Sequence, residues 1–309
     1  MSHASPFHPD LQAAARWLPR GVGRGWLVKL MRALPMPTPR LPAGVTVRQH
    51  SLDGRGSASV RVIGAAGGDG PRPALLWIHG GGYVIGRAKQ DDLLCARFAT
   101  ALGVTVVSVD YRLAPEHPFP TPVEDCLAAY EWLHREASTL GIDPSRVVIG
   151  GQSAGGGLAA ALALLIHDRG RPAPRLQLLV YPMLDDRTVL REGNGRHHRL
   201  WDGPSNRLGW TSYLGREPGG ADVPDYAAPA RRAELRGLPA AWIGVGTCDL
   251  FHDEDVAYAE RLRQAGVGVE LERVDGAFHG FDAALPGAPV SQRFFEAQCA
   301  AIARALGRS

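Results

Sequence analysis

The residues best suited to nucleophilic chemistry lie at 151–155, where Gly-Gln-Ser-Ala-Gly has the G-x-S-x-G spacing of a nucleophile elbow. A β-branched run at 147–149 precedes this motif, and an Ala- and Leu-rich stretch at 158–166 follows it. A strand, a tight turn and a helix are the context that the motif requires. We therefore expect Ser153 to stand exposed above a sheet as a nucleophile, with the N–H group of Ala154 facing a developing oxyanion at the helix start.

The G-x-S-x-G motif is not specific by itself. It often occurs by chance, so it could mark a glycine-rich turn that only serves packing. A phosphate-binding loop is a weaker alternative, because the stretch lacks the Gly-Lys-Ser or Gly-Lys-Thr ending of such loops. The decision depends on residues elsewhere in the chain, since a serine hydroxyl needs a general base and an oriented partner for that base.

His279 is the candidate general base. It lies in a glycine-flanked run, Gly-Ala-Phe-His-Gly-Phe, five residues after the apolar run that ends at Val274. In proteins with this elbow the chain order is serine, acid and histidine, each on a loop after a strand. Most of the eleven histidines lie outside this order or fit a structural role, such as His134 and His167 on predicted helices. The position of His279 therefore favours the base role over the structural role that a lone histidine more often has.

Asp249 is the candidate acid, and it has rivals. It follows the apolar run that ends at Val245, which places it on a loop after a predicted strand. Asp253 directly precedes a predicted helix, so its ordinary role would be an N-cap. Asp275 and Asp282 flank the histidine loop and fit the acid role less well. Placement at a strand end favours Asp249.

A loop of three glycines follows the predicted strand at 74–78. It reads His79-Gly80-Gly81-Gly82, and bare glycine backbone there lets N–H groups point at a carbonyl oxygen. Removing one such donor typically costs about 3 kcal/mol of transition-state stabilisation. A merely flexible loop is the alternative, but a triple glycine after a buried strand and ahead of G-x-S-x-G favours an oxyanion hole.

Five ordered motifs together resemble one family. They read WIHGGGYVIG at 77–86, VDYRLAPEHPFP at 109–120, GGQSAGG at 150–156, DLFHDED at 249–255 and FHGF at 278–281. In these motifs the chain is similar to the hormone-sensitive-lipase-like carboxylesterases, the bacterial group called family IV. The resemblance covers roughly residues 75–285, and five specific motifs in the right order make it highly specific.

The resemblance implies a role for each matching residue. Ser153, Asp249 and His279 would form a catalytic triad. The backbone N–H groups of Gly81, Gly82 and Ala154 would form the oxyanion hole, and His79 would hold the glycine loop in place. Short or medium acyl chains would be preferred, and a homodimer would be in keeping with many relatives.

This sequence departs from the family pattern at two places. The family usually has an aspartate before the serine, whereas this chain has Gln152, which removes a charge beside the elbow. The aspartate motif commonly reads D-P-L-x-D-E, and here Phe251 and His252 stand in its middle without a proline. The second departure affects loop shape and pocket contacts more than the role of Asp249.

Four residues are candidates for an apolar pocket that would hold the acyl or alcohol group. They are Tyr83, Trp210, Leu250 and Phe281. Ordinary packing in the core would account for each of them equally well.

The remaining pattern predicts an α/β fold, namely the α/β-hydrolase fold with a mostly parallel sheet of about eight strands, helices on both faces and a helical cap. Short apolar runs that alternate with helical stretches are typical of strands buried on both faces. The predicted strands are 74–79, 104–109, 147–149, 176–181, 241–245 and 269–274, preceded by an antiparallel pair at 45–51 and 59–63. The predicted helices are 11–18, 25–34, 91–102, 122–140, 154–169, 254–265 and 291–306.

A gap of about sixty residues between Tyr181 and Ala241 interrupts this alternation. The gap is too long for a simple crossover and carries its own aromatic residues, so we expect a lid over the site rather than a packing excursion. The predicted organisation is an N-terminal cap segment at 1–40, a catalytic domain in two parts at 41–185 and 226–309, and a cap insertion at 186–225.

Composition excludes several other classes. The net charge is only +3 and the arginines are scattered. The sequence therefore has no dense run of basic residues of the kind that indicates nucleic-acid binding. The longest apolar run, 158–166, is too short to span a membrane, and no signal-peptide pattern begins the chain. Widely spaced cysteines without a C-x-x-C motif fit reduced thiols and a cytoplasmic protein. These are Cys95, Cys126, Cys248 and Cys299.

We expect hydrolysis of small-molecule carboxylic esters through an acyl-serine, without a cofactor and without a metal. An amidase or peptidase with the same triad is one alternative, but no dedicated acidic or basic specificity site stands out. A non-catalytic small-molecule receptor of the same fold is another. His279 and the intact glycine loop disfavour a receptor.

Overall fold

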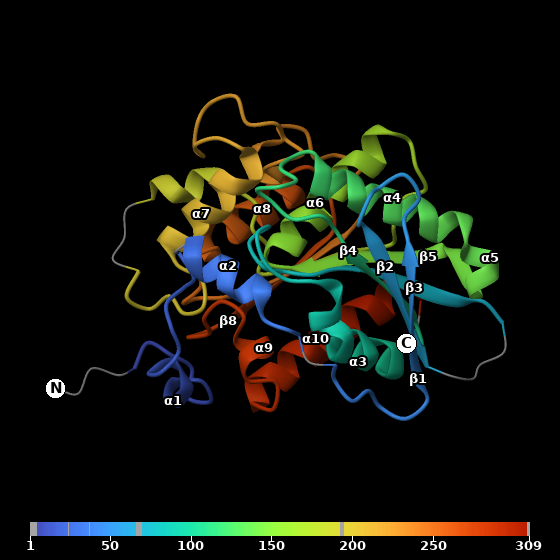
Figure 1. The fold of residues 1–309 in the computed structure, drawn as a ribbon, viewed down its shortest axis with the longest axis horizontal. Helices are drawn as coiled ribbons and strands as arrows, with labels where there is room; N and C mark the ends of the chain where they lie inside the picture. The colour runs from blue at the N-terminus through green and yellow to red at the C-terminus, as the bar shows by residue number, and fades with distance from the viewer. Residues whose placement is uncertain (1–4, 24, 37, 66–69, 192–194, 308–309) are drawn as a thin grey trace.

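An eight-stranded sheet organises the structure, which is a computed structural model (Figure 1). The structure describes residues 5–23, 25–36, 38–65, 70–191 and 195–307. The strands are β1 (Val45–Ser51), β2 (Ser59–Ala65), β3 (Arg72–Ile78), β4 (Thr105–Asp110), β5 (Ile142–Gln152), β6 (Gln177–Val180), β7 (Ala241–Gly246) and β8 (Val269–Val274). Their order across the sheet is β1-β2-β4-β3-β5-β6-β7-β8. Only the pairs β1–β2 and β2–β4 are antiparallel, so the mostly parallel sheet is confirmed.

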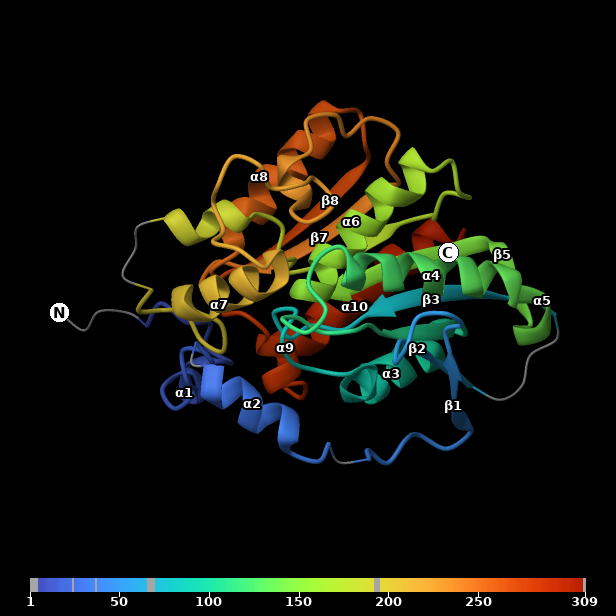
Figure 2. The ribbon, with the colours of Figure 1, turned by 45° about the horizontal axis from the view of Figure 1, so that its top comes forward.

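Helices cover both faces of the sheet (Figures 1 and 2). One face is covered by α4 (Thr121–Arg135), α6 (Ala154–Asp168) and α8 (His252–Gln264), and the other by α3 (Asp92–Leu102) and α10 (Pro289–Ala305). The other helices are α1 (Gln12–Ala15), α2 (Gly25–Ala33), α5 (Ala137–Leu140), α7 (Gly203–Leu214), α9 (Phe281–Ala284) and the 3-10 turns η1 (Ala88–Asp91), η2 (Asp186–Leu190) and η3 (Pro229–Arg231).

Two apolar clusters make the core, one on each face of the sheet. Helix α6 is buried from Ala154 to Ile166, which explains its small and apolar composition. Alternate residues of β3 point to opposite sides, Leu76 into the cluster with α6 and Leu75 into the cluster with α3. The continuous apolar character of β3 follows from burial on both faces.

One expectation about a helix is wrong. The helix expected at 122–140 is broken at Glu136 into α4 and α5, because that residue leaves the helical region (φ −90°, ψ 5°). Pro120 is the N-cap of α4, and no side chain caps the helix. The end of the pair at Gly141 is confirmed, with the left-handed φ of 63° that glycine adopts easily.

The N-terminal segment and the insertion that follows β6 meet at the carboxyl ends of the strands. Helices α1, α2 and α7 gather there (Figure 2). The N–H of Leu200 donates to the carbonyl oxygen of Pro19 (2.9 Å), and the N–H of Val22 donates to the hydroxyl of Ser205 (2.8 Å). A Cβ on Gly21 would lie 2.2 Å from an oxygen of Asp202, so this close approach requires glycine.

Among the residues that the structure describes, no helix combines the length and the apolar character needed to cross a bilayer.

Candidate active site

Four strands bring the candidate residues to one edge of the sheet. Ser153 follows β5 directly, the glycine loop begins at Gly80 two residues after β3, Asp249 follows β7 and His279 follows β8. All four strands run in the same direction, so their carboxyl ends meet at the same edge. Residues separated by up to 126 positions in the chain therefore come within hydrogen-bond distance.

Ser153 occupies a strained turn between β5 and α6. Its backbone has φ 55° and ψ −121°, which side-chain-bearing residues rarely adopt. The flanking glycines are needed for close packing, as expected: a Cβ on Gly151 would lie 2.4 Å from the carbonyl oxygen of Gly155. The N–H of Ser153 donates to Val180 on the neighbouring strand (2.9 Å), which ties the elbow to the sheet.

Replacing Gly155 by alanine is expected to lower the free energy of unfolding by about 3 kcal/mol or to prevent folding. Its Cβ would lie 2.1 Å from the carbonyl oxygen of Ile78 and 2.5 Å from that of His79, and rigid strand backbone cannot move away. Urea denaturation measures the change. Gly203→Ala is the matched control, because no atom lies within 4 Å of the added methyl group, and it should stay within about 0.5 kcal/mol. Equal stability of both variants would contradict the packing argument.

His279 links the other two candidate residues. Its Nε2 lies 2.9 Å from the Oγ of Ser153, and its Nδ1 lies 2.8 Å from Oδ2 of Asp249. An ionised carboxylate only accepts, so Nδ1 carries the proton and Nε2 is free to accept the proton of Ser153. The other oxygen of Asp249 accepts from the N–H of Phe251 (2.9 Å), which fixes the carboxylate.

The loops that carry Asp249 and His279 are bonded to each other. The N–H of Cys248 donates to Ala277 (2.9 Å), and the N–H of Gly276 donates to the hydroxyl of Thr247 (2.8 Å). The strands β7 and β8 have six residues each. The contacts between the two loops hold the side chains of Asp249 and His279 in position beyond the ends of these strands.

The rival acids lie elsewhere. The side chain of Asp253 is 77% exposed and contacts Arg191 and His252 instead of His279. It lies in the first turn of α8 and does not cap it, because Phe251 is the N-cap. Asp275 is exposed, and Asp282 hydrogen-bonds to the hydroxyl of Tyr181 (2.8 Å).

Three backbone N–H groups are the expected donors of an oxyanion hole. Among the described residues, no acceptor is found for the N–H groups of Gly81, Gly82 or Ala154. His79 supports the glycine loop, since it is fully buried, stacks on Tyr111 with ring centroids 4.3 Å apart and bonds through Nδ1 to the carbonyl of Gly80 (2.7 Å). Burial lowers the pKa of His79, so the neutral ring is favoured.

Trp201 covers the glycine loop. A Cβ on Gly82 would lie 2.0 Å from the edge of the Trp201 ring, and that ring lies 6.5 Å from the ring of His279. The preceding residue, Leu200, has a φ of 65°, which is strained for a leucine and turns the chain toward the site. The sequence signal for Trp201 was only its presence in an aromatic-rich insertion.

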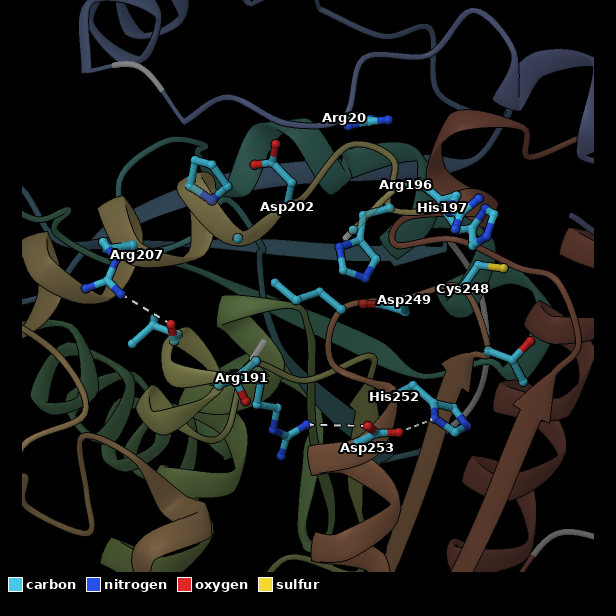
Figure 3. Close-up of a pocket in the computed structure, with 18 residues that line it drawn as sticks. Arg20, Arg191, Arg196, His197, Asp202, Arg207, Cys248, Asp249, His252 and Asp253 are labelled. Atoms are coloured by element: carbon cyan, nitrogen blue, oxygen red, sulfur yellow. Dashed lines mark hydrogen bonds and ion pairs between the residues drawn. The ribbon is translucent and has the colours of Figure 1, made fainter. Parts of the chain in front are cut away.

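A cavity of about 860 Å³ opens beside the acid loop (Figure 3). It is bounded by three parts of the chain: Arg20 from the N-terminal segment, residues of the insertion at 188–191 and 195–207, and the loop from Thr247 to Asp253. Leu250, one of the four candidate pocket residues, lines this cavity.

The other three expected pocket residues lie in the core. Trp210 and Phe281 are fully buried, and Tyr83 is 1% exposed. Tyr83 stacks on Tyr213 with ring centroids 4.0 Å apart, whereas Phe281 packs against Phe294 at 5.0 Å. None of the three lines the cavity, so packing is the role that the structure gives them.

Comparison with known proteins identifies the family. A family model described as the alpha/beta hydrolase fold matches residues 75–283. The carboxylic ester hydrolase LipN of Mycobacterium tuberculosis is 38% identical over 265 residues, which cover 81% of this chain and 68% of that protein. The chain belongs to the hormone-sensitive-lipase-like carboxylesterases of the α/β-hydrolase superfamily. The family resemblance seen in the sequence is therefore confirmed.

Further relatives of this carboxylesterase carry related names. An ethyl acetate hydrolase of Pseudomonas putida is 40% identical over 218 residues, covering 67% of this chain and 65% of that protein. Among solved structures, one titled bacterial heroin esterase superposes with a TM-score of 0.86 at 40% identity, covering 98% of this chain and 99% of that one. Esterase LipW of Mycobacterium marinum gives a TM-score of 0.84 at 34% identity, covering 97% and 96%.

The described part of the carboxylesterase contains no group of three or more His, Cys, Asp or Glu side chains arranged to hold a metal ion.

Proposed function

We propose that this chain is a serine carboxylesterase that hydrolyses short- to medium-chain esters of small molecules through an acyl-serine intermediate. One observation carries the proposal: His279 lies between the Oγ of Ser153 (2.9 Å) and the carboxylate of Asp249 (2.8 Å), beside backbone N–H groups that lack an acceptor. The names of the relatives, which include esterases and ester hydrolases, support the ester as substrate.

Each residue has a part in the reaction. Nε2 of His279 takes the proton of Ser153 as its Oγ attacks the ester carbonyl carbon. Asp249 holds the imidazole by Nδ1 and stabilises its charged form, while the N–H groups of the glycine loop and Ala154 stabilise the oxyanion. His279 then protonates the leaving alcohol, and the serine stays acylated. A water molecule, deprotonated by His279, attacks the acyl-serine and releases the acid.

Residues 1–40 and 186–225 would form the cap over this site. The bonds from Leu200 to Pro19 and from Val22 to Ser205 support a single unit made of both segments. Trp201, which lies on Gly82, would belong to this cap. A homodimer and a cytoplasmic location stay predictions.

The test is a chain-length series of p-nitrophenyl esters from acetate to palmitate, together with the p-nitroanilide of the best acyl group. We expect kcat/KM to peak between the acetate and octanoate esters and to be far lower for the anilide. Faster cleavage of the anilide than of its ester would instead support the amidase alternative. Binding of small hydrophobic acids without turnover of any activated ester would support the receptor alternative.

A further inference from the structure

Gln152, the residue that departs from the family pattern, is built into a hydrogen-bonded chain beneath the elbow. It is 8% exposed, and its Nε2 lies 3.1 and 3.2 Å from the two oxygens of Asp91. Asp91 ends the turn that follows the glycine loop and is 6% exposed. The Nε1 of Trp77, on β3, also donates to Asp91 (2.8 Å). The buried carboxyl group of Asp91 is thus held by the indole of Trp77 and the amide of Gln152, and the side chain of Gln90 also donates to it.

The amide oxygen of Gln152 is connected to His279 through Tyr181. Its Oε1 lies 3.3 Å from the hydroxyl of Tyr181, and that hydroxyl lies 2.8 Å from Oδ1 of Asp282. The ring of Tyr181 packs edge-on against the imidazole of His279, with centroids 4.8 Å apart. Tyr181 has a φ of 35°, so its backbone is strained and its ring depends on these contacts for its position.

The series of hydrogen bonds from Asp282 through Tyr181 and Gln152 to Asp91 has one arrangement of protons that satisfies every contact. Tyr181 has a single hydroxyl proton, and both Asp282 and the Gln152 carbonyl oxygen stand within reach of it. Both contacts are satisfied when Asp282 is protonated and donates to Tyr181, which then donates to Gln152, which in turn donates to Asp91. Burial raises the pKa of Asp282.

Asp91 is the carboxyl group that the amide of Gln152 contacts directly. Burial raises the pKa of Asp91 to about 7 from its ordinary 3.8, and the donor Trp77 opposes the rise. The other titratable groups that face Asp91 are Asp92, Asp282, Tyr181, Tyr111 and Cys95, and Asp92 is paired with Arg61 at 2.6 Å. No cation among the described residues forms an ion pair with Asp91 itself, so a second charge beside it would be strongly opposed.

We propose that Gln152 is a positioning residue: its uncharged amide joins Asp91 to Tyr181 and so holds the Tyr181 ring against His279. Its effect on catalysis rests on the proposed esterase function, in which His279 is the general base. A carboxylate at the same position would face Asp91 at about 3 Å, where two charges cannot both persist. The amide donates to the acid on one side and accepts from the hydroxyl on the other, which a carboxylate cannot do.

The test compares Gln152→Glu, the isosteric Asp91→Asn and the double variant that carries both. Gln152→Glu is expected to lower kcat about ten- to a hundredfold at pH 8 with KM changed less than about twofold, because the imidazole is displaced while the pocket is intact. Much of kcat should return at pH 6, where the acid pair can hold a proton. The double variant exchanges amide and carboxylate without changing shape, so it should restore kcat to within about threefold at both pH values.

Thermal melting gives a readout that needs no activity. A carboxyl whose folded pKa is raised stabilises the fold at low pH, and this contribution is lost as pH rises through the folded pKa. For Asp91 in the wild type the loss falls between about pH 4 and 7. In Gln152→Glu a second raised carboxyl extends the loss to higher pH, so its Tm should fall further below the wild type at pH 9 than at pH 6. The double variant should follow the wild-type curve.

The control is Gln264→Glu, because Gln264 also lies 3.1 Å from a carboxylate, that of Glu260, but is exposed to solvent. It should leave both kcat and the Tm difference unchanged across this pH range. The proposal would be overturned if kcat and Tm of Gln152→Glu had the wild-type dependence on pH. It would also be overturned if the double variant recovered neither the kcat nor the Tm of the wild type. If the wild type cleaved no ester, the proposed function would be wrong. The melting curves would still test the contact between Gln152 and Asp91, because they do not depend on activity.

Discussion

Replacing Ser153 by alanine is expected to lower kcat for ester hydrolysis by about a millionfold. The hydroxyl oxygen that lies 2.9 Å from Nε2 of His279 is the atom that would form the covalent acyl bond, and no other group can take its place in that geometry. Hydrolysis of p-nitrophenyl butyrate measures kcat, and mass spectrometry of the enzyme mixed with a slow ester measures the acyl adduct. The adduct should be absent from the variant.

Ser138→Ala is the matched control, because Ser138 is an exposed serine on α5 and belongs to neither the elbow nor the cap. It should retain full activity and the acyl adduct. Full activity in the Ser153→Ala variant, with a native melting curve, would remove the central residue from the proposed mechanism.

Replacing Asp249 by asparagine is expected to lower kcat about ten-thousandfold. The amide can still accept from the N–H of Phe251, so the loop should keep its shape. It no longer presents an anion at 2.8 Å to Nδ1 of His279, so the imidazole loses both its correct tautomer and the charge that stabilises its protonated form. The same kinetic assay, together with circular dichroism to verify the fold, checks this result.

Asp253→Asn serves as the comparison, since its side chain is 77% exposed and lies outside the hydrogen-bonded set of His279. Its exposed contacts contribute little, so kcat should change less than about threefold. If Asp253→Asn lost more activity than Asp249→Asn, the acid of the proposed triad would have to be reassigned.

Much of the fold could be predicted because strands that are buried on both faces of a sheet have short, continuous apolar sequences. The strands Val45–Ser51 and Val269–Val274 were expected with the bounds that the structure gives, and most of the other predicted strands differ by one or two residues at an end. The largest difference is β5, which runs from Ile142 to Gln152 although only 147–149 was expected. Glycines at 150 and 151 weaken the strand pattern there, because close packing against α6 and the neighbouring strand requires them.

The candidate site was predictable to the extent that its residues follow strands in a recognisable order. Ser153, Asp249 and His279 could be named because glycine-rich loops after predicted strands carry them. The roles of Trp201 and Asp91 could not, since both depend on where distant segments meet. For the same reason sequence alone could not distinguish buried aromatic residues, such as Trp210, from residues that line a cavity.

The contacts between the N-terminal segment and the insertion have a consequence for recombination among relatives. Pro19 and Val22 bond to Leu200 and Ser205, and Gly21 is fitted against Asp202, so two stretches about 180 residues apart share one interface. A chimaera that exchanged only 186–225 would pair a foreign surface with the resident N-terminal segment. Substrate range in this scaffold should therefore be transferable between homologues only when both stretches are inherited from the same parent.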